Sequence, residues 1–161
     1  MISLNNKIPL SFLFSVLTKS YVGALNKKCE SLKIDRYHYT LTVIYKAKGK
    51  ITQQELADFL QIDKASVVRI VDFLVKQKLI KREINSNDRR QHFLVVTETG
   101  VSEAKQIEVE INKMNKTALN GLSVKEVEVL FKALQKMDTN LSELPSDKYF
   151  LNIRKIKNEK K

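Results

Sequence analysis

The chain of 161 residues is long enough for one domain, or for one domain with helical extensions. Its 29 Lys and Arg residues against 18 Asp and Glu residues give a formal net charge of +11, which favours a polyanionic partner such as nucleic acid or an acidic membrane surface. The charge does not choose between these partners, and a basic protein can also simply be soluble. The single cysteine, Cys29, excludes an intramolecular disulfide and leaves too few thiols for a zinc finger.

An apolar run near the start, Ile8–Leu17, has the length of a signal-peptide core. Only Lys7 supplies a basic flank, however, and apolar positions continue at helical spacing beyond the run. No stretch approaches the roughly 18 apolar residues of a transmembrane helix. We therefore expect a cytoplasmic protein without a membrane partner.

Apolar residues recur at three- and four-residue steps from Pro9 to Leu32, which predicts one long amphipathic helix with Pro9 in its first turn. Asp35 is expected to cap a second helix, which ends before Gly49. Residues 1–34 are accordingly assigned to an N-terminal helical region.

The next segment carries two closely spaced helix starts. Thr52 and Glu55 have the spacing of a capping box, which predicts a short helix ending at Leu60. Asp63 is expected to cap a second helix, Asp63–Lys78. Because only a few residues separate the two, the pair has helix-turn-helix spacing.

After Leu79 the apolar pattern changes to strict alternation on both sides of a polar turn, Asn85–Asp88. The alternating positions are Ile80, Arg82 and Ile84 before the turn and Phe93, Val95 and Thr97 after it. This pattern predicts a two-stranded hairpin with a polar tip, Asn87–Arg90. A hairpin after a helix-turn-helix forms a wing, so we assign residues 35–97 to a winged helix-turn-helix.

Two further helices are predicted after the hairpin. Thr97 opens the first, which Gly121 stops, and Ser123 with Glu126 forms a second capping box that opens the last helix. Residues 98–144 hold this helical region, and residues 145–161 form a basic tail that either adds nonspecific phosphate contacts or is disordered. The predicted fold class is mainly α with a small β-hairpin wing.

The helix that starts at Asp63 has the features of a DNA-reading helix. Small residues permit close approach to the major groove, a hydroxyl can bond a base or a phosphate, a valine can touch a thymine methyl, and an arginine fork fits guanine or phosphate. The residues concerned lie opposite the apolar stripe of this helix: Lys64, Ala65, Ser66, Val68 and Arg69. The alternative is that Lys64 and Arg69 merely solvate a surface helix.

The predicted wing strengthens the DNA interpretation. Arg89 and Arg90 at a hairpin tip can reach a narrow, electronegative minor groove, and Asp88 can orient one of these arginines. Thr52 and Gln53, at the start of the first helix of the motif, complete the predicted contact set.

The combined pattern resembles the multiple antibiotic resistance regulator (MarR) family. The likeness rests on a recognition helix, a Leu-Ile turn, an Asp-x-Arg wing and a Thr-x-x-Gly helix start, found here in Asp63–Lys78, in Leu79–Arg82 and in Asp88–Gly100. Gln77-Lys78 stands where the family often has Lys-Gly, and Val96 where it usually has Leu. The likeness extends from Leu10 to Leu144.

This resemblance implies a triangular homodimer in which the first, fifth and sixth helices interleave and the two winged domains contact successive grooves of a palindromic operator. The apolar stripes on the flanking helices fit that role, because left exposed they would invite aggregation. The alternative is that these helices fold back onto their own domain.

Family members typically release DNA when a small aromatic or lipophilic effector binds between the dimerisation and DNA-binding parts. The aromatic residues that could line such a pocket, or could simply be core, are Phe14, Tyr21, His38 and Tyr45. Peroxide-sensing members carry a cysteine near the start of the first helix, where this chain has Ser11. We therefore expect Cys29 to be a structural core residue. With only His38 and His92 as histidines, no zinc or other metal site and no cofactor is expected.

The sequence thus predicts a sequence-specific transcription regulator that acts as a repressor and has double-stranded DNA as its partner. One alternative is a nonspecific or architectural nucleic-acid binder that uses its charge and its tail, and another is a winged helix used for protein contacts. No enzyme is expected, because nucleophile–base spacing and a Gly-rich phosphate loop are both absent from the sequence.

Overall fold

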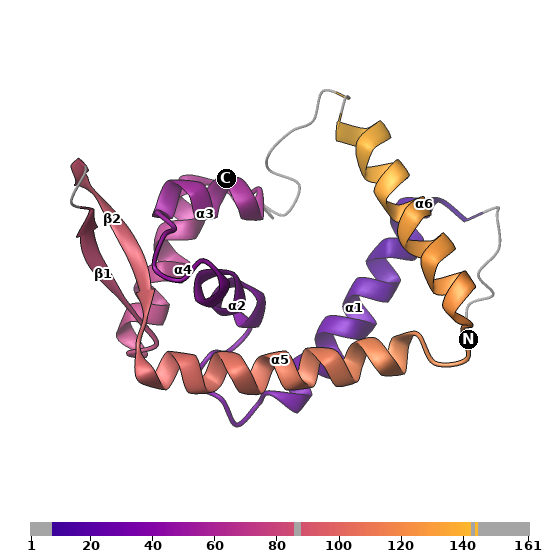
Figure 1. The fold of residues 1–161 in the computed structure, drawn as a ribbon, viewed down its shortest axis with the longest axis horizontal. Helices are drawn as coiled ribbons and strands as arrows, with labels where there is room; N and C mark the ends of the chain where they lie inside the picture. Colours follow the sequence, from indigo (N-terminus) through magenta and orange to yellow (C-terminus); the bar gives the residue numbers. More distant parts are fainter. Residues whose placement is uncertain (1–7, 86–87, 143, 145–161) are drawn as a thin grey trace, which may run out of the picture.

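The computed structural model describes residues 8–85, 88–142 and 144, without the side chains of residues 88–90. The described part is mainly helical with one β-hairpin, which confirms the predicted fold class (Figure 1). The predicted basic tail lies outside the described residues. The elements in chain order are α1 Leu10–Lys28, α2 His38–Lys46, α3 Gln53–Leu60, α4 Lys64–Lys76, β1 Ile80–Asn85, β2 Asp88–Val96, α5 Glu98–Ala118 and α6 Val124–Ser142.

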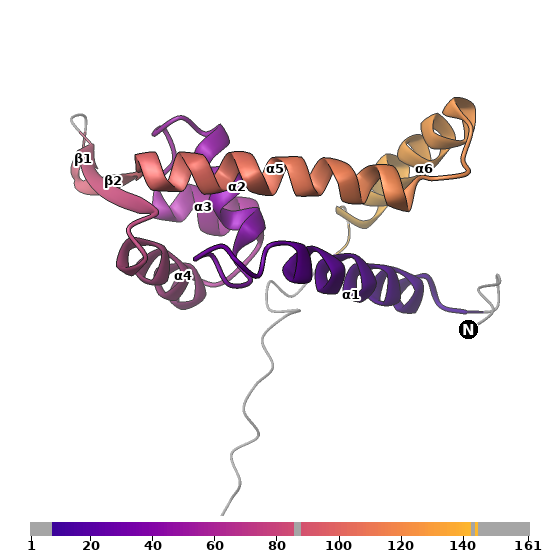
Figure 2. The same ribbon diagram turned by 90° about the horizontal axis from the view of Figure 1, so that it is seen from below.

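The long helix α5 organises the molecule. The hairpin, α2, α3 and α4 gather around its N-terminal part, whereas α1 and α6 lie towards its C-terminal end (Figure 1). Seen from below, α1 runs alongside the C-terminal half of α5, and α1 also packs against it (Figure 2). The hairpin with α2, α3 and α4 is called the winged unit, and α1 with α6 is called the helical arm. The two lie towards opposite ends of one continuous helix, α5.

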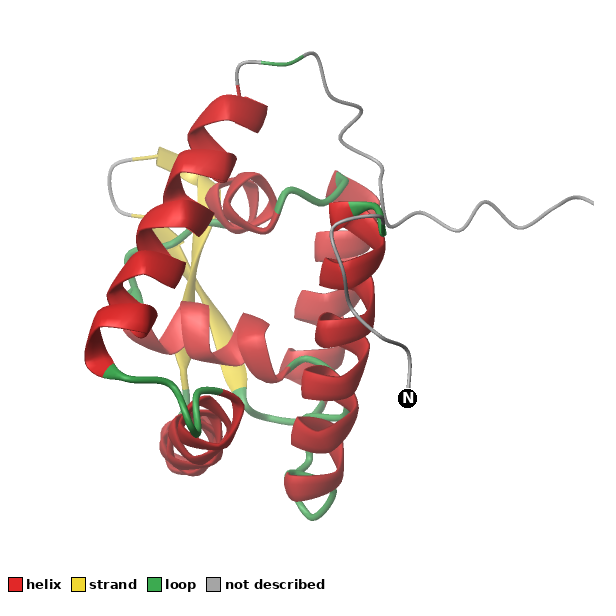
Figure 3. Cartoon of the chain, turned by 90° about the vertical axis from the view of Figure 1, so that its right-hand side faces the viewer, coloured by secondary structure: helices red, strands yellow, loops and turns green. Residues whose placement is uncertain are grey.

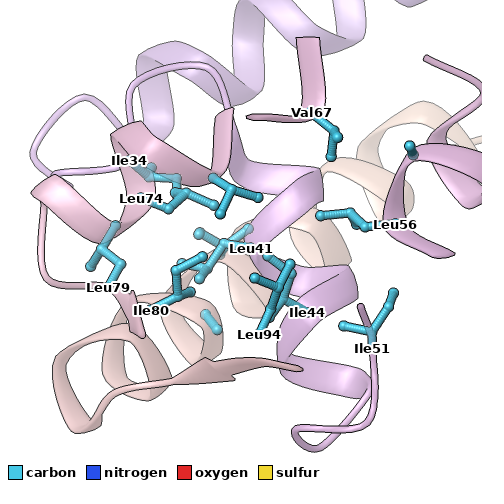
Figure 4. Packing of buried hydrophobic residues seen from close by; sticks show 14 of the residues in the cluster. Ile34, Leu41, Ile44, Ile51, Leu56, Val67, Leu74, Leu79, Ile80 and Leu94 are labelled. Atoms are coloured by element: carbon cyan, nitrogen blue, oxygen red, sulfur yellow. The ribbon is translucent and has the colours of Figure 1, made fainter. Parts of the chain in front are cut away.

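The core of the winged unit is formed by aliphatic side chains from every element around α5. Figure 4 shows these side chains converging between the helices and the hairpin. Leu41 and Ile44 of α2 are fully buried, and each such side chain contributes roughly 1.5–3 kcal/mol through removal of apolar surface from water. Their fully buried partners are Ile34, Leu56, Val71, Leu74, Leu79, Leu94 and Ile107.

The hairpin pairs antiparallel from Ile80 opposite Val96 to Ile84 opposite His92, with a register irregularity after Ile84. Its two strands are the only sheet within the described residues (Figure 3). The backbone N–H of Leu94 donates to the Ile51 carbonyl at 2.9 Å, which ties β2 to the segment that starts α3. The hairpin is therefore fixed at its base, close to the two helices of the motif.

The predicted helix starts are confirmed at four positions. In each case a side-chain oxygen accepts a backbone N–H from the first turn, which satisfies a donor that the helix itself leaves unpaired. The pairs are Thr52 with Glu55 at 3.2 Å, Asp63 with Ser66 at 2.8 Å, Thr97 with Gly100 at 3.1 Å and Ser123 with Glu126 at 3.3 Å.

The predicted path from the first helix to the second is wrong. The helix α1 ends at Lys28, and Asp35 does not cap α2, because its φ of 53° places it in a left-handed turn three residues before the helix starts at His38. The reason is tertiary: Cys29 and Ile34 are buried in the core, so the chain between them must turn instead of continuing the helix.

Two details of the hairpin also differ from the prediction. The strand β2 begins at Asp88, so Arg89 and Arg90 belong to the strand and not to the turn, because continued pairing satisfies backbone groups that a longer turn would leave open. Ile84 is 66% exposed although it alternates with buried Ile80, since the hairpin extends past the core at that point. None of the helices in the described part of the chain has the length and hydropathy of a membrane span.

Candidate nucleic-acid interface

The exposed side of α4 is set by the stripe that the helix buries. Val67, Val71 and Leu74 are buried, and Ile70 is half-buried against the same core. The opposite side is thereby turned outward, as predicted from the helical period. Of the predicted contact residues on it, Lys64, Ala65 and Arg69 are exposed, and Ser66 and Val68 are half-buried.

Three polar side chains at the start of α4 are joined by hydrogen bonds. The Ser66 hydroxyl donates to Asp63 Oδ2 at 2.6 Å, and Arg69 Nη2 donates to Ser66 Oγ at 3.0 Å. Asp63 Oδ1 accepts the Ser66 backbone N–H, so one carboxylate both caps the helix and holds the serine. Sequence spacing predicted the cap, but it did not predict the link to Arg69.

Thr52 and Gln53 are near this surface but have different partners. The buried Thr52 hydroxyl donates to Glu55 Oε2 at 2.8 Å and accepts the Glu55 N–H, so it is engaged in starting α3. The backbone and hydroxyl hydrogen bonds from Thr52 lower the pKa of the Glu55 carboxyl, because they favour its ionised form. Gln53 is half-buried, and its Oε1 accepts from Arg82 Nε at 3.0 Å.

Arg82 is a functional candidate that the sequence analysis treated only as a strand residue. Its Nη2 also lies 2.5 Å from Asp72 Oδ1, so this one guanidinium connects β1 to both α3 and α4. The sequence signal for Arg82 is an arginine on a strand that follows a helix carrying an aspartate. Oppositely charged residues are often placed in this way without touching, so the signal alone does not select Arg82. The partner Gln53 is 29 positions away in sequence.

A hollow of about 480 Å³ opens where the starts of α3 and α4 face β2. Gln53 and Lys64, both predicted contact residues, lie on its wall, together with Gln54, Gln91 and His92, which the sequence analysis did not select. This polar lining brings the two helices of the motif and the hairpin into a single surface. Of the predicted wing residues, Asp88, Arg89 and Arg90 have backbones in β2, but their side chains lie outside the described residues.

The four aromatic residues predicted for an effector pocket do not share one environment. Tyr21 donates to Asn115 Oδ1 at 2.8 Å and so docks on α5, and burial raises the pKa of its phenol. Phe14 is 39% exposed on α1, His38 is buried at the start of α2, and Tyr45 is half-buried against the core. Their predicted contact with an effector stays a prediction.

A cavity of about 350 Å³ lies elsewhere, between α2 and α3, and the sequence analysis did not anticipate it. Its lining includes Tyr39, Val43 and Phe59. The prediction for Cys29 is confirmed, because this residue is 2% exposed in the hydrophobic core. Burial, and secondarily the charge of Glu110, raises the pKa of its thiol and so disfavours the reactive thiolate.

Comparison with known proteins identifies the scaffold. The sequence model of the MarR family matches residues 34–91, and solved structures of the same type match most of the chain. A MarR family transcriptional regulator from Listeria monocytogenes, solved with a 26-mer DNA, has 26% identity and a TM-score of 0.77 over 84% of this chain and 90% of that one. Residues 34–91 thus match the MarR family, and the fold of the described chain is similar to that of MarR-type regulators solved with DNA. The predicted resemblance is thereby confirmed.

Two further MarR-type structures have the same relation to this chain. MepR from S. aureus, solved as a DNA complex, has 25% identity and a TM-score of 0.77 over 83% of this chain and 99% of that one. A mutant MarR from E. coli complexed with operator DNA has 26% identity and a TM-score of 0.73 over 85% of this chain and 99% of that one. The segment matched by the MarR family model ends in β2, so it contains α3, α4 and β1 complete.

Proposed function

We propose that this chain is a sequence-specific DNA-binding transcription regulator that represses transcription by binding a palindromic operator as a homodimer. The observation that carries the proposal is the exposed start of α4, where Lys64, Ala65 and Arg69 project beside a polar hollow shared with α3 and β2. Small and basic side chains at the N-terminus of such a helix suit entry into the major groove and contact with phosphate. The proposal contains no catalytic step.

The homodimer is supported by apolar surface that one subunit leaves uncovered. None of the α6 side chains is buried by the described part of the chain. Many large apolar side chains left exposed along two helices mark an interface. These side chains are Leu10, Phe12, Phe14, Leu17 and Val22 on α1, and Val124, Val129, Leu130, Phe131, Leu134 and Leu141 on α6.

Response to a small aromatic or lipophilic effector is the further part of the proposal. It is supported by the match to the MarR family and by the position of α1 and α5, which connect the proposed dimer surface to the winged unit. Phe14, Tyr21, His38 and Tyr45 remain the proposed contacts.

The test of DNA binding compares affinity for the duplex upstream of the gene with affinity for a random duplex of equal length. Lys64→Ala and Arg69→Ala should each weaken specific binding, the arginine change by about 5- to 150-fold, because a groove contact is worth roughly 1–3 kcal/mol. Lys132→Ala, which removes an exposed lysine from α6, is the matched control and should bind as the unaltered chain does. Equal affinity for both duplexes would contradict sequence-specific regulation and favour a nonspecific binder.

A further inference from the structure

We propose that Arg69 reads a guanine in the major groove and that Asp63 and Ser66 are positioning residues that hold its guanidinium in place. The inference rests on the proposed function and deepens it, since it names the base contacted by α4 and the residues that set its geometry. It also changes the role expected for Ser66 from direct contact to support.

The positions of the three residues allow this support. They follow one another at intervals of three along the start of α4, so their side chains lie on one edge of the helix. Asp63 Oδ2 accepts the Ser66 hydroxyl proton at 2.6 Å, and Ser66 Oγ accepts from Arg69 Nη2 at 3.0 Å. The chain of bonds therefore runs from a fixed helix cap to an exposed cation.

The single proton of Ser66 decides what this side chain can do at the DNA surface. A serine hydroxyl has one donor and two acceptor lone pairs, and here the donor is taken by a carboxylate. Donation to a phosphate oxygen or to guanine O6 would require giving up a charge-assisted hydrogen bond. Ser66 therefore positions Arg69, and Arg69 is the residue that donates to acceptor atoms of the DNA.

Arg69 keeps enough donors to read a base. A guanidinium has five N–H groups, and the bond to Ser66 uses one of them. Two of the remaining groups can bond O6 and N7 of guanine side by side, a geometry that a planar fork matches and a lysine does not. Holding the side chain before binding reduces the conformational entropy lost on contact.

The carboxylate of Asp63 favours a base over a phosphate as the target. A negative charge beside an arginine weakens simple attraction to the DNA backbone, which mobile lysines such as Lys64 can contact without any support. The same charge helps to orient the arginine, because Asp63 holds the Ser66 hydroxyl and this hydroxyl holds the Arg69 guanidinium. The neighbours Ala65 and Val68 lack a polar side-chain atom, and Lys64 has no planar fork. Arg69 is therefore the one side chain at the start of α4 that can bond O6 and N7 of guanine side by side.

The experiment starts by selecting duplexes from a random pool with the full chain, which yields a preferred half-site. The affinities of the unaltered protein and of its variants are then measured for that site and for a site in which each half-site guanine is replaced in turn by 7-deazaguanine, which lacks the N7 acceptor but pairs normally. At one guanine we expect a loss of about fivefold or more for the unaltered chain and no loss for Arg69→Ala.

Three variants separate support from contact. Ser66→Ala should weaken specific binding by about three- to tenfold, the range of one lost hydrogen bond, and Ser66→Thr should restore it. Asp63→Ser keeps a side chain that caps the helix but removes the second carboxylate oxygen, so it should match Ser66→Ala. In the Arg69→Ala background, Ser66→Ala should cause no further loss, and the uncharged change Ser66→Ala should leave random-duplex affinity unchanged.

Each contrary result identifies its own cause. A full Ser66→Ala loss in the Arg69→Ala background would mean that the serine contacts DNA itself and would overturn its positioning role. An equal 7-deazaguanine effect with and without Arg69, together with a salt dependence that falls by about one ion in Arg69→Ala, would mean a phosphate contact and would overturn guanine reading. A pool without any enriched sequence would overturn the proposed function, and this inference with it.

Discussion

His38, the first residue of α2, is 3% exposed, and its Nε2 is buried without a hydrogen-bond partner in the described chain. Burial lowers the pKa of this imidazole because the charged form loses its hydration, while the charge of Asp35 acts in the opposite direction and is the smaller effect. The folded protein therefore holds His38 neutral more strongly than the unfolded chain does.

This difference predicts a loss of stability in mild acid. In the unfolded chain the histidine takes up a proton as the pH falls through about 6.5, whereas the folded protein resists protonation until a lower pH. The free energy of unfolding should therefore fall as the pH decreases below about 6.5, by at most roughly 1.4 kcal/mol per pH unit from this residue. Urea unfolding between pH 5 and 7.5 at one protein concentration measures the effect.

The chain supplies a matched control in its second histidine. His38→Gln should flatten the pH dependence, whereas His92→Gln, which alters an exposed strand residue, should preserve it. The same acid loss in both variants would show that His38 is not the source.

At the scale of elements, the orientation of the exposed side of α4 depends on contacts between β1, α3 and α4. Arg82 of β1 bonds both Asp72 of α4 and Gln53 of α3, while its side chain is 31% exposed. A pair this exposed contributes at most about 1 kcal/mol to folding, since water and salt screen it. Its larger effect is geometric, because it links the hairpin to both helices of the motif.

We expect Arg82→Gln to lower operator affinity by more than its small effect on stability explains. Asp72→Asn should do the same, and the double variant should lose less than the sum of the two, because the residues act through one contact. Fluorescence anisotropy and thermal unfolding, measured on the same samples, separate affinity from stability. Glu83→Gln breaks the exposed Lys81–Glu83 pair on the same strand and should leave both quantities unchanged. Strict additivity of the two losses would argue against coupling.

The difference between local and distant contacts explains what could be predicted. The capping boxes of Thr52 and Ser123 were predictable because both partners lie within one helical turn. The left-handed turn at Asp35 was not, because the burial of Cys29 and Ile34 depends on other elements. For the same reason the sequence selected Arg69 as a contact but could not assign the Ser66 proton, which required atomic positions.

At the scale of the whole molecule, the outward apolar face of α6 is the feature that one subunit does not explain. Phe131 is 58% exposed and Val124 is 77% exposed, and burying both in a second copy would remove much of this apolar area from water. The interface of a two-fold dimer contains each such residue twice.

Phe131→Glu should therefore shift the protein from dimer to monomer. Two anchors worth about 2 kcal/mol each would raise the dissociation constant roughly a thousandfold. Sedimentation velocity over a range of concentrations measures this shift. Ile84→Glu is the matched control, because Ile84 is equally apolar and 66% exposed but lies on the hairpin. A monomer produced by both variants, or by neither, would contradict an interface through α6.

The continuous helix α5 can also transmit a tilt from the helical arm to the winged unit. Its 21 residues span about 30 Å from the base of the hairpin to the arm, where Tyr21 of α1 is anchored on Asn115. A rigid rod of that length moves its far end by about half an ångström for each degree of tilt. A rotation of a few degrees at the arm therefore moves the base of the hairpin by more than about 1 Å, a displacement that is large compared with the tolerance of a hydrogen bond, although no bond within the winged unit needs to break.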